Sequence, residues 1–265
     1  MIEVRNVSKR FGQTVALDGV SMTVERGEIL GFLGPNGAGK STAMKIITSF
    51  LAPDDGTVVV DGMDVGEKPL EVRARIGYMP ENVPLYTDMR VEEYLEFVGR
   101  ARGLGGGQLR SRLAWAVEAC HLEPVYKQSI LELSKGFRQR TGLAQALIHD
   151  PEILILDEPT SGLDPLQIIG IRELIRELGR SKTILFSTHI LQEVAPVTDR
   201  VVIINQGQVV ADGRIGELKQ RAMGSNRVRI GLDELPEGLE SALASVPGVT
   251  KVLPMDERRF EIFGS

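Results

Sequence analysis

Residues 34–42 read Gly34-Pro35-Asn36-Gly37-Ala38-Gly39-Lys40-Ser41-Thr42, and they match the phosphate-loop pattern G-x-x-x-x-G-K-[ST] at every fixed position. An apolar run over 29–32 precedes the loop as a buried strand would. Apolar residues follow at helical spacing: Ala43, Ile46, Ile47, Phe50 and Leu51. The glycines allow successive backbone N–H groups to converge on phosphates. We therefore expect a nucleoside triphosphate site, with positive charge from Lys40 and the helix N-terminus, and with the Ser41 hydroxyl available to Mg²⁺.

A second group of candidate residues follows two apolar strands. The aliphatic run 153–156 ends in Asp157-Glu158, and buried carboxylates without partners are costly. We expect Asp157 to hold magnesium through water and Glu158 to orient or deprotonate an attacking water. The buried strand 183–186 ends in Ser187-Thr188-His189. That places His189 beyond the carboxyl end of a strand, where ligands bind in α/β proteins.

Three further features lie in turns and at helix starts. Phe11 stands in the polar turn Lys9-Arg10-Phe11-Gly12, where a large aromatic ring gains little from a core. We interpret it as a stacking platform for adenine. Ser134 is suited to cap a helix that starts at 135, and Gly136 allows a ligand to approach the first turn. The loop Ser161–Asp164 precedes a helix that begins at Pro165.

The order of elements predicts an α/β fold, in which a P-loop NTPase core carries an antiparallel β subdomain and an inserted helical subdomain. Short alternating runs over 2–25 indicate antiparallel strands, and 75–79 is expected to be a central strand. Helical spacing dominates about 85–149. We expect an ATP-binding domain over 1–223 and a small α+β C-terminal segment over 224–265, with strands at 228–232, 249–253 and 260–263 and a helix at 238–246.

Composition limits the classes of protein that remain. A net charge of -5 argues against a dedicated nucleic-acid binder, and no nucleic-acid partner is expected. The single cysteine, Cys120, forms no internal disulfide, which fits a reducing cytosol. No run of 18 or more apolar residues is present, so no membrane span is expected. These features predict a cytoplasmic protein.

Taken together, the phosphate loop, the helix start at 134–136, Asp157-Glu158, Ser161–Asp164 and His189 resemble the ATP-binding subunit of ABC transporters. The resemblance covers about residues 1–220. It is nearest to a gliding-motility-type, exporter-like group whose permease is a separate chain. The segments that carry this finer likeness are Gly77-Tyr78-Met79-Pro80-Glu81-Asn82 and Leu133-Ser134-Lys135-Gly136-Phe137-Arg138-Gln139-Arg140.

The resemblance implies a head-to-tail homodimer with two ATP molecules between the subunits and Mg²⁺ as cofactor. On this basis Phe11 stacks on adenine and residues 34–42 hold the phosphates. Asp157 supports magnesium, Glu158 is the catalytic carboxylate, and His189 is a switch near the γ-phosphate. Ser134 and Gly136 contact the γ-phosphate bound to the other subunit, while Ser161–Asp164 bridges the two sites.

Three positions depart from the family pattern. Lys135 stands where a glycine is usual, and Phe137 and Glu81 each stand where a glutamine is usual. Ser134 and the backbone donors remain, so phosphate binding is expected to survive. Glu81 still offers an oxygen to magnesium or water, and its extra negative charge is expected to alter affinity or turnover.

The leading hypothesis is an ATPase that drives an integral membrane permease from the inner face of the cell membrane. One alternative is a soluble ABC ATPase that acts on ribosomes or DNA. Ribosomal relatives usually carry two ATPase domains and DNA-repair relatives insert long coiled coils, whereas this chain has one phosphate loop and no such heptads. A non-hydrolysing module is disfavoured by the presence of Glu158 and His189. Val83, Leu85 and Tyr86 are candidates for permease docking; substrate and transport direction stay open.

Overall fold

The computed structural model describes residues 1–198, 200–223, 226–231, 238–256 and 258–264 of the 265. The chain forms two compact units, Met1–Asp212 and Gly213–Ser265, and each is described by itself. This division falls before helix α8 (Ile215–Met223), whereas the sequence-based boundary lay after it.

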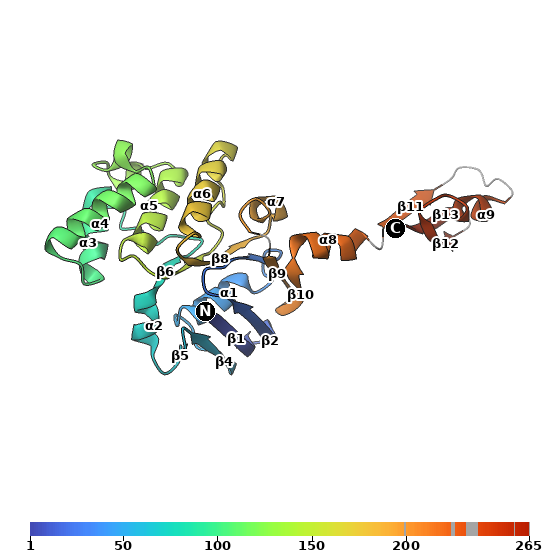
Figure 1. Ribbon diagram of the computed structural model, residues 1–265, viewed down its shortest axis with the longest axis horizontal. Helices are drawn as coiled ribbons and strands as arrows, with labels where there is room; N and C mark the ends of the chain where they lie inside the picture. Colours follow the sequence, from blue (N-terminus) through green and yellow to red (C-terminus); the bar gives the residue numbers. More distant parts are fainter. Residues whose placement is uncertain (199, 224–225, 232–237, 257, 265) are drawn as a thin grey trace. The chain divides into compact units, whose positions relative to one another are not determined.

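The first unit contains two sheets (Figure 1). The four-stranded antiparallel sheet has the order β2-β1-β4-β5, with β1 (Ile2–Phe11), β2 (Thr14–Val24), β4 (Asp55–Val60) and β5 (Met63–Asp64). The six-stranded sheet has the order β10-β9-β3-β8-β7-β6, with β3 (Ile29–Leu33), β6 (Ile76–Met79), β7 (Ile153–Leu156), β8 (Thr183–Thr188), β9 (Arg200–Asn205) and β10 (Gln208–Arg214).

The strands from β9 to β6 pair in parallel, so the carboxyl ends of β3, β7 and β8 meet at one edge of the sheet. All side chains of β7 and β8 are buried, which explains their unbroken apolar runs. The strand expected at 75–79 is present as β6, but its expected central position was wrong. In the described sheet β6 is the last strand and pairs with β7 alone.

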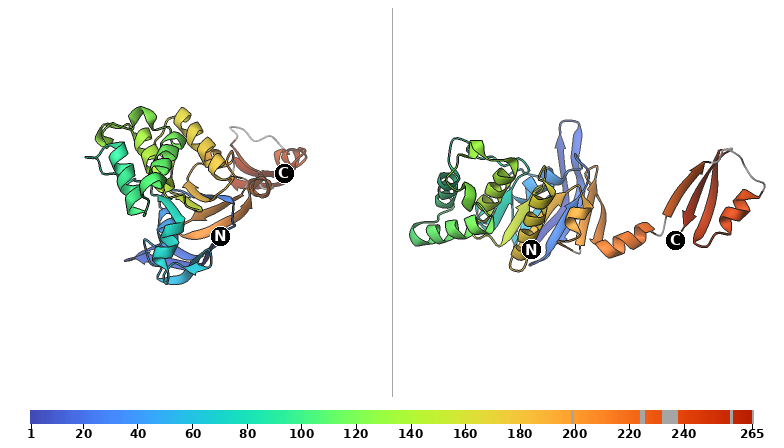
Figure 2. Two further views of the ribbon diagram at one scale, coloured as in Figure 1. Left: turned by 60° about the vertical axis from the view of Figure 1, so that its left-hand side comes forward. Right: turned by 90° about the horizontal axis from the view of Figure 1, so that it is seen from above.

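Seven α-helices complete the described part of this unit, namely α1 (Lys40–Ile47), α2 (Pro69–Arg75), α3 (Val91–Ala101), α4 (Gly106–Ala119), α5 (Lys135–Leu147), α6 (Pro165–Leu178) and α7 (Leu191–Val194). Short 3₁₀ turns lie at Glu123–Val125 and Ile130–Glu132. Helices α3, α4 and α5 gather on one side of the six-stranded sheet (Figures 1 and 2). They occupy the range in which a helical subdomain was expected.

One hydrophobic core joins the two sheets around α1. Ala43, Ile46 and Ile47 of α1 are buried, as their helical spacing predicted. The prediction for Phe50 was wrong, because the helix ends at Ile47 and the Phe50 side chain is 75% exposed. The backbone turns at Ser49, which has a φ of 55°.

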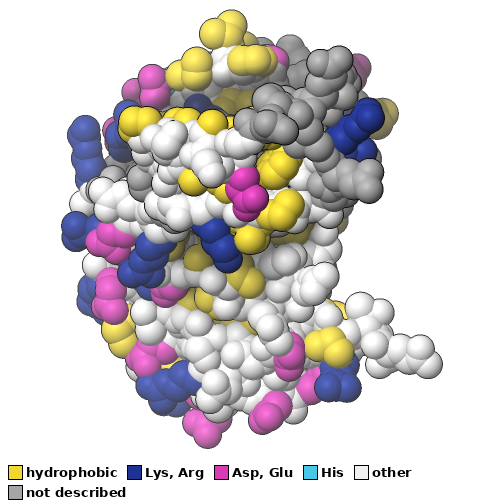
Figure 3. Space-filling model, turned by 90° about the vertical axis from the view of Figure 1, so that its right-hand side faces the viewer, with side chains coloured by type: hydrophobic (Ala, Val, Ile, Leu, Met, Phe, Trp, Pro, Cys, Tyr) yellow, Lys and Arg dark blue, Asp and Glu magenta, His cyan; other side chains and the backbone are white. Residues whose placement is uncertain are grey.

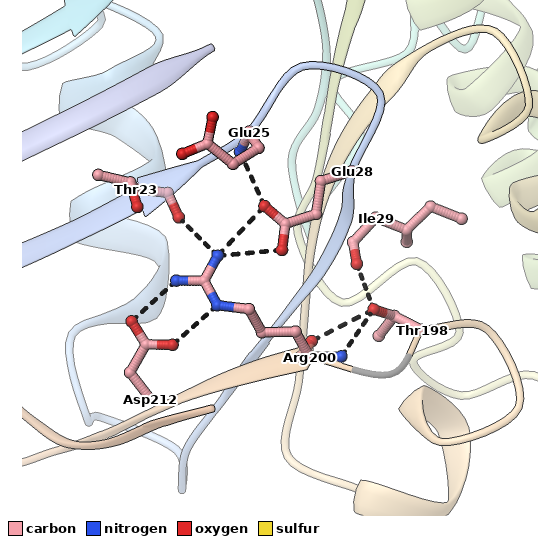
Figure 4. Close-up of polar contacts among 7 residues, drawn as sticks. All are labelled: Thr23, Glu25, Glu28, Ile29, Thr198, Arg200 and Asp212. Carbon is pink, nitrogen blue, oxygen red and sulfur yellow. Dashed lines mark hydrogen bonds and ion pairs between the residues drawn. The ribbon is translucent and has the colours of Figure 1, made fainter. Parts of the chain in front are cut away.

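Arg200 of β9 ties together three segments that are distant in sequence (Figure 4). Its Nε and Nη2 donate to Asp212 of β10 at 2.9 and 2.9 Å, and its Nη1 donates to Glu28 at 3.0 and 3.1 Å. Hydrogen bonding to Asp212 raises the pKa of the Arg200 guanidinium, and the bond to Glu28 adds to this effect. Thr198 donates to the carbonyl of Ile29. These contacts fix the position at which β3 begins, and β3 leads directly into the phosphate loop.

The second unit contains α8 and a three-stranded antiparallel sheet of order β11-β13-β12, beside which lies α9 (Figure 2). The elements are β11 (Asn226–Gly231), α9 (Leu239–Ala244), β12 (Val249–Asp256) and β13 (Arg259–Gly264). Phe260 on the central strand is buried. The order of strand, helix, strand and strand agrees with the sequence prediction. Leu232, the expected end of the first strand, and residues 224–225 of the expected linker lie outside the described residues.

Within the described ranges, no helix is long and apolar enough to cross a membrane. On the face shown in Figure 3, acidic and basic side chains are interspersed, with apolar side chains between them.

Candidate functional site

The phosphate loop runs from the end of β3 to the start of α1 and contacts the ends of neighbouring strands. The Gly34 N–H donates to the carbonyl of Thr188 at 3.4 Å, and the Ala38 carbonyl accepts from the N–H of Gly207 at 3.0 Å. Gly39 has a φ of 109°, and a Cβ atom there would lie 2.5 Å from the Ala16 carbonyl oxygen. Only glycine fits such a position without strain. The curled loop therefore depends on the residue type that the motif prescribes.

Lys40 starts α1 and is buried within the loop, with 6% of its surface exposed. Its ammonium donates to the carbonyls of Gly34 and Pro35 at 2.7 and 3.2 Å. It also lies 3.2 Å from Oε1 of Glu158. The structure thus brings the phosphate-loop lysine and the predicted catalytic carboxylate into one buried ion pair.

Glu158 adopts a backbone conformation that side-chain-bearing residues rarely adopt. Its φ is 48°, in the left-handed region, and such outliers cluster at functional sites. The Glu158 N–H is held by the Ser187 hydroxyl at 2.9 Å, and Oε2 lies 3.0 Å from Nδ1 of His189. Lys40, Glu158 and His189 therefore form a contiguous group at the sheet edge, although they are far apart in sequence.

Asp157 is almost fully buried and accepts a hydrogen bond of 2.6 Å from the Ser187 hydroxyl. It lines a cavity of about 450 Å³ together with Ser41, Glu81 and Tyr78. Burial raises the pKa of the Tyr78 hydroxyl, and the charge of Asp157 raises it further. The three oxygen-bearing residues predicted to serve magnesium thus share one cavity.

Ser187 is a site residue that sequence reasoning did not single out. It is fully buried and bonds both to the Asp157 carboxylate and to the Glu158 backbone. The feature of the sequence that could have identified Ser187 is its place at the polar end of an otherwise apolar strand, directly before Thr188-His189.

Ser134, Gly136 and Asp164 form a separate group. Ser134 caps α5 by accepting from the Phe137 N–H at 3.4 Å. Asp164 caps α6 by accepting from the Gln167 N–H at 2.9 Å. A Cβ atom on Gly136 would lie 2.6 Å from the carboxamide of Gln167, so the two helix starts are in close contact. Among the described residues, the hydrogen bonds and ion pairs join neither Ser134 nor Gly136 to the phosphate loop.

Phe11 lies at the end of β1, opposite Thr14, with 51% of its surface exposed. The Lys9 ammonium is 5.9 Å from the ring centroid. An aromatic ring exposed in this way can accept a planar base against its face.

Comparison with known proteins agrees with this arrangement. The profile of the ABC transporter family matches residues 17–161. The chain is 37% identical over 245 residues to the ABC transporter ATP-binding protein NatA of Bacillus subtilis, which covers 90% of this chain and 100% of that protein. It is also 37% identical to the daunorubicin resistance ATP-binding protein DrrA3 of Streptomyces coeruleorubidus, over 94% of this chain and 79% of the relative.

Among solved structures, a dimeric bacterial ABC transporter cassette superposes with a TM-score of 0.76 at 26% identity, covering 81% of this chain and 99% of the other. The same cassette in a post-hydrolysis state with ADP and phosphate gives a TM-score of 0.75. The predicted fold class and the predicted ATPase activity are confirmed. The chain belongs to the ABC transporter family, in which it is an ATP-hydrolysing, ATP-binding subunit.

Proposed function

We propose that two copies of this chain close around two ATP molecules and that ATP hydrolysis then drives a separate membrane permease. The observation that carries the proposal is the buried ion pair of Lys40 and Glu158 at the phosphate loop, together with the exposed imidazole of His189 that contacts Glu158. It combines a phosphate-binding cation, a carboxylate base and an imidazole within 3.2 Å contacts. These are the groups that hydrolysis of a terminal phosphate needs.

In the proposed mechanism, the N–H groups of residues 34–42 and the N-terminus of α1 hold the phosphates. Lys40 exchanges its contacts with the loop carbonyls and Glu158 for the phosphate oxygens. Glu158, released from Lys40, accepts a proton from the attacking water while His189 holds its other oxygen. Phe11 stacks on the adenine ring. The left-handed backbone at Glu158 holds the carboxylate at the loop before substrate arrives.

The residues of the cavity at Asp157 fit a magnesium ion. The Ser41 hydroxyl and the carboxylates of Asp157 and Glu81 are hard oxygen donors, which Mg²⁺ prefers. Bound there, the ion would neutralise charge on the outer phosphates. The Ser187 hydroxyl orients the Asp157 carboxylate for this role.

The second copy would complete each site. Ser134 and the first-turn N–H groups of α5 stand at an exposed helix start, and they suit the γ-phosphate held by the partner. Lys135 departs from the usual glycine, and its ammonium packs against Gly162 in the loop Ser161–Asp164. Movement of this loop would therefore displace Lys135 and with it the start of α5.

The proposed permease docks beside the helical subdomain. Tyr86 is 50% exposed and packs against Tyr94 and Phe97, with ring centroids 5.9 and 5.6 Å away. Val83 packs on Gly142 and ties the segment after Glu81 to α5. A relative is named for daunorubicin resistance, which favours export as the direction of transport. The protein would then act at the inner face of the cell membrane.

The proposal predicts the behaviour of Glu158→Gln. The variant retains the shape and hydrogen bonding of the side chain but lacks the base, so we expect ATP binding to persist and hydrolysis to fall about 10²–10⁴-fold. ATP-dependent dimers should accumulate and be measurable by sedimentation. A variant that hydrolyses ATP at the wild-type rate would contradict the role of Glu158.

The partner is tested by purification of the tagged protein from its native cells in mild detergent. We expect a polytopic membrane protein to accompany it. Ribosomal subunits or DNA-repair factors without a membrane protein would instead favour action on ribosomes or DNA.

A further inference from the structure

We propose that Glu193 is a positioning residue for ATP hydrolysis, which holds Glu158 and His189 at their working separation through the hydroxyls of two threonines. The inference rests on the proposed roles of Glu158 and His189. It adds a residue that lies outside the phosphate loop and outside the motifs found in the sequence.

Glu193 lies on α7, the short helix that follows β8, and only 5% of its surface is exposed. One oxygen of its carboxylate, Oε2, accepts two hydrogen bonds. The Thr160 hydroxyl donates to it at 2.6 Å, and the Thr188 hydroxyl donates at 2.7 Å. Both threonines are buried as well. A single buried oxygen therefore joins the segment after β7, the end of β8 and helix α7.

The two threonines flank the catalytic pair. Thr160 is in the turn that Glu158 opens, where the N–H of Ser161 donates to the Glu158 carbonyl at 3.0 Å. Thr188 directly precedes His189, and its carbonyl accepts from the Gly34 N–H of the phosphate loop at 3.4 Å. Fixing both hydroxyls on Glu193 thus fixes the backbone on either side of the 3.0 Å contact between Glu158 and His189.

A carboxylate suits this position better than an apolar side chain would. Burying it is costly unless it is hydrogen-bonded, and hydroxyl donors to a carboxylate give short, strong bonds. Helix α7 has one turn only, so its own backbone bonds provide little rigidity. The two hydroxyl bonds supply the rigidity that the helix lacks, at the segment that carries His189.

The test measures kcat, ATP affinity and thermal stability for Glu193→Met and Glu193→Gln. Methionine has a similar length and accepts no strong hydrogen bond, so we expect kcat to fall about 10- to 100-fold, as a misplaced catalytic group would cause. ATP affinity by calorimetry should stay unchanged. Glutamine retains an oxygen that can accept both bonds and should restore most of kcat.

The matched control is Thr183→Val on the same strand. The Thr183 hydroxyl is also buried and accepts from the Gly27 N–H at 2.9 Å, but it stands at the opposite end of β8. We expect this variant to lose stability and retain kcat. Thr160→Val and Thr188→Val should each lower kcat and, combined, should leave Glu193→Met with no further loss. If Glu193→Met does not fold, the two threonine variants test the positioning role of Glu193 in its place.

Wild-type kcat in Glu193→Met, or in both threonine variants, would overturn the inference. Glu158→Gln is measured in parallel to separate the two hypotheses. If Glu158→Gln is inactive while the Glu193 and threonine variants hydrolyse ATP normally, only the positioning role fails. If Glu158→Gln itself hydrolyses ATP normally, the proposed function fails and the inference fails with it.

Discussion

Replacement of Ser187 by alanine tests whether the fold and the site depend on one hydroxyl. The Ser187 Oγ donates to Asp157 at 2.6 Å and accepts from the Glu158 N–H at 2.9 Å, and the residue is fully buried. Ser187→Ala removes both bonds and leaves almost no cavity. The Glu158 N–H would be left without an acceptor in a place that water does not reach.

The expected cost follows from these two bonds. A hydrogen bond to a charged group contributes about 1.5–3 kcal/mol, and a buried amide without an acceptor costs about 1–3 kcal/mol. We therefore expect the free energy of unfolding to fall by roughly 3–5 kcal/mol. With a urea m-value of about 3 kcal/mol/M for a unit of this size, the midpoint should fall by about 1–1.7 M.

Urea titration is followed by the fluorescence of Trp115, the only tryptophan of the chain. ATPase activity of the folded variant should fall too, because Asp157 and Glu158 both lose an anchor. Thr183→Val loses a single neutral bond on the same strand and should shift the midpoint less. A shift below about 0.3 M for Ser187→Ala would refute the reasoning.

The sequence was sufficient to predict the strand, loop and helix around residues 34–42 and the two buried strands at 153–156 and 183–186, whose ends carry Asp157, Glu158 and His189. Each belongs to a local pattern whose physical cause is confined to a few neighbouring residues. The buried runs 153–156 and 183–188 are unambiguous because both faces of these strands are covered.

What the sequence did not reveal depends on pairing between distant segments. The strand at 76–79 has the composition of a buried strand, and its place at the sheet edge follows from which strands lie beside it. Ser187 and Glu193 carry no motif, since their importance arises from partners about thirty residues away. Phe50 fitted the helical spacing of α1, but the backbone turned before it.

Two further variants test packing and pH dependence. In Gly77→Ala the new Cβ would lie 2.2 Å from the Ala146 carbonyl oxygen, so we expect the free energy of unfolding, measured by urea titration, to fall by about 1–3 kcal/mol. A variant as stable as the wild type would show that β6 and α5 are not in such close contact. Burial, followed by the charge of Arg102, lowers the pKa of His149 from 6.5 to about 4, so the unfolded chain binds the proton more readily between these values. The contribution of neutral His149 to the free energy of unfolding should be fully present above pH 6.5 and should fall towards pH 4 by up to about 3 kcal/mol. His149→Gln should flatten this pH dependence, which is measured by thermal unfolding at a series of pH values. An unchanged dependence would contradict the assignment.

The central claim, that each ATP is hydrolysed between two copies of the chain, is tested most directly by mixing two inactive variants. Lys40→Ala removes the phosphate-loop charge, and Ser134→Arg blocks the helix start that would serve the partner. A mixed dimer retains one site with an intact phosphate loop and an intact α5 start. With random pairing and independent sites, ATPase activity should recover to about one quarter of wild type. Recovery of this size, from variants that are each inactive alone, is the predicted result; a mixture as inactive as its two components would contradict the shared-site account.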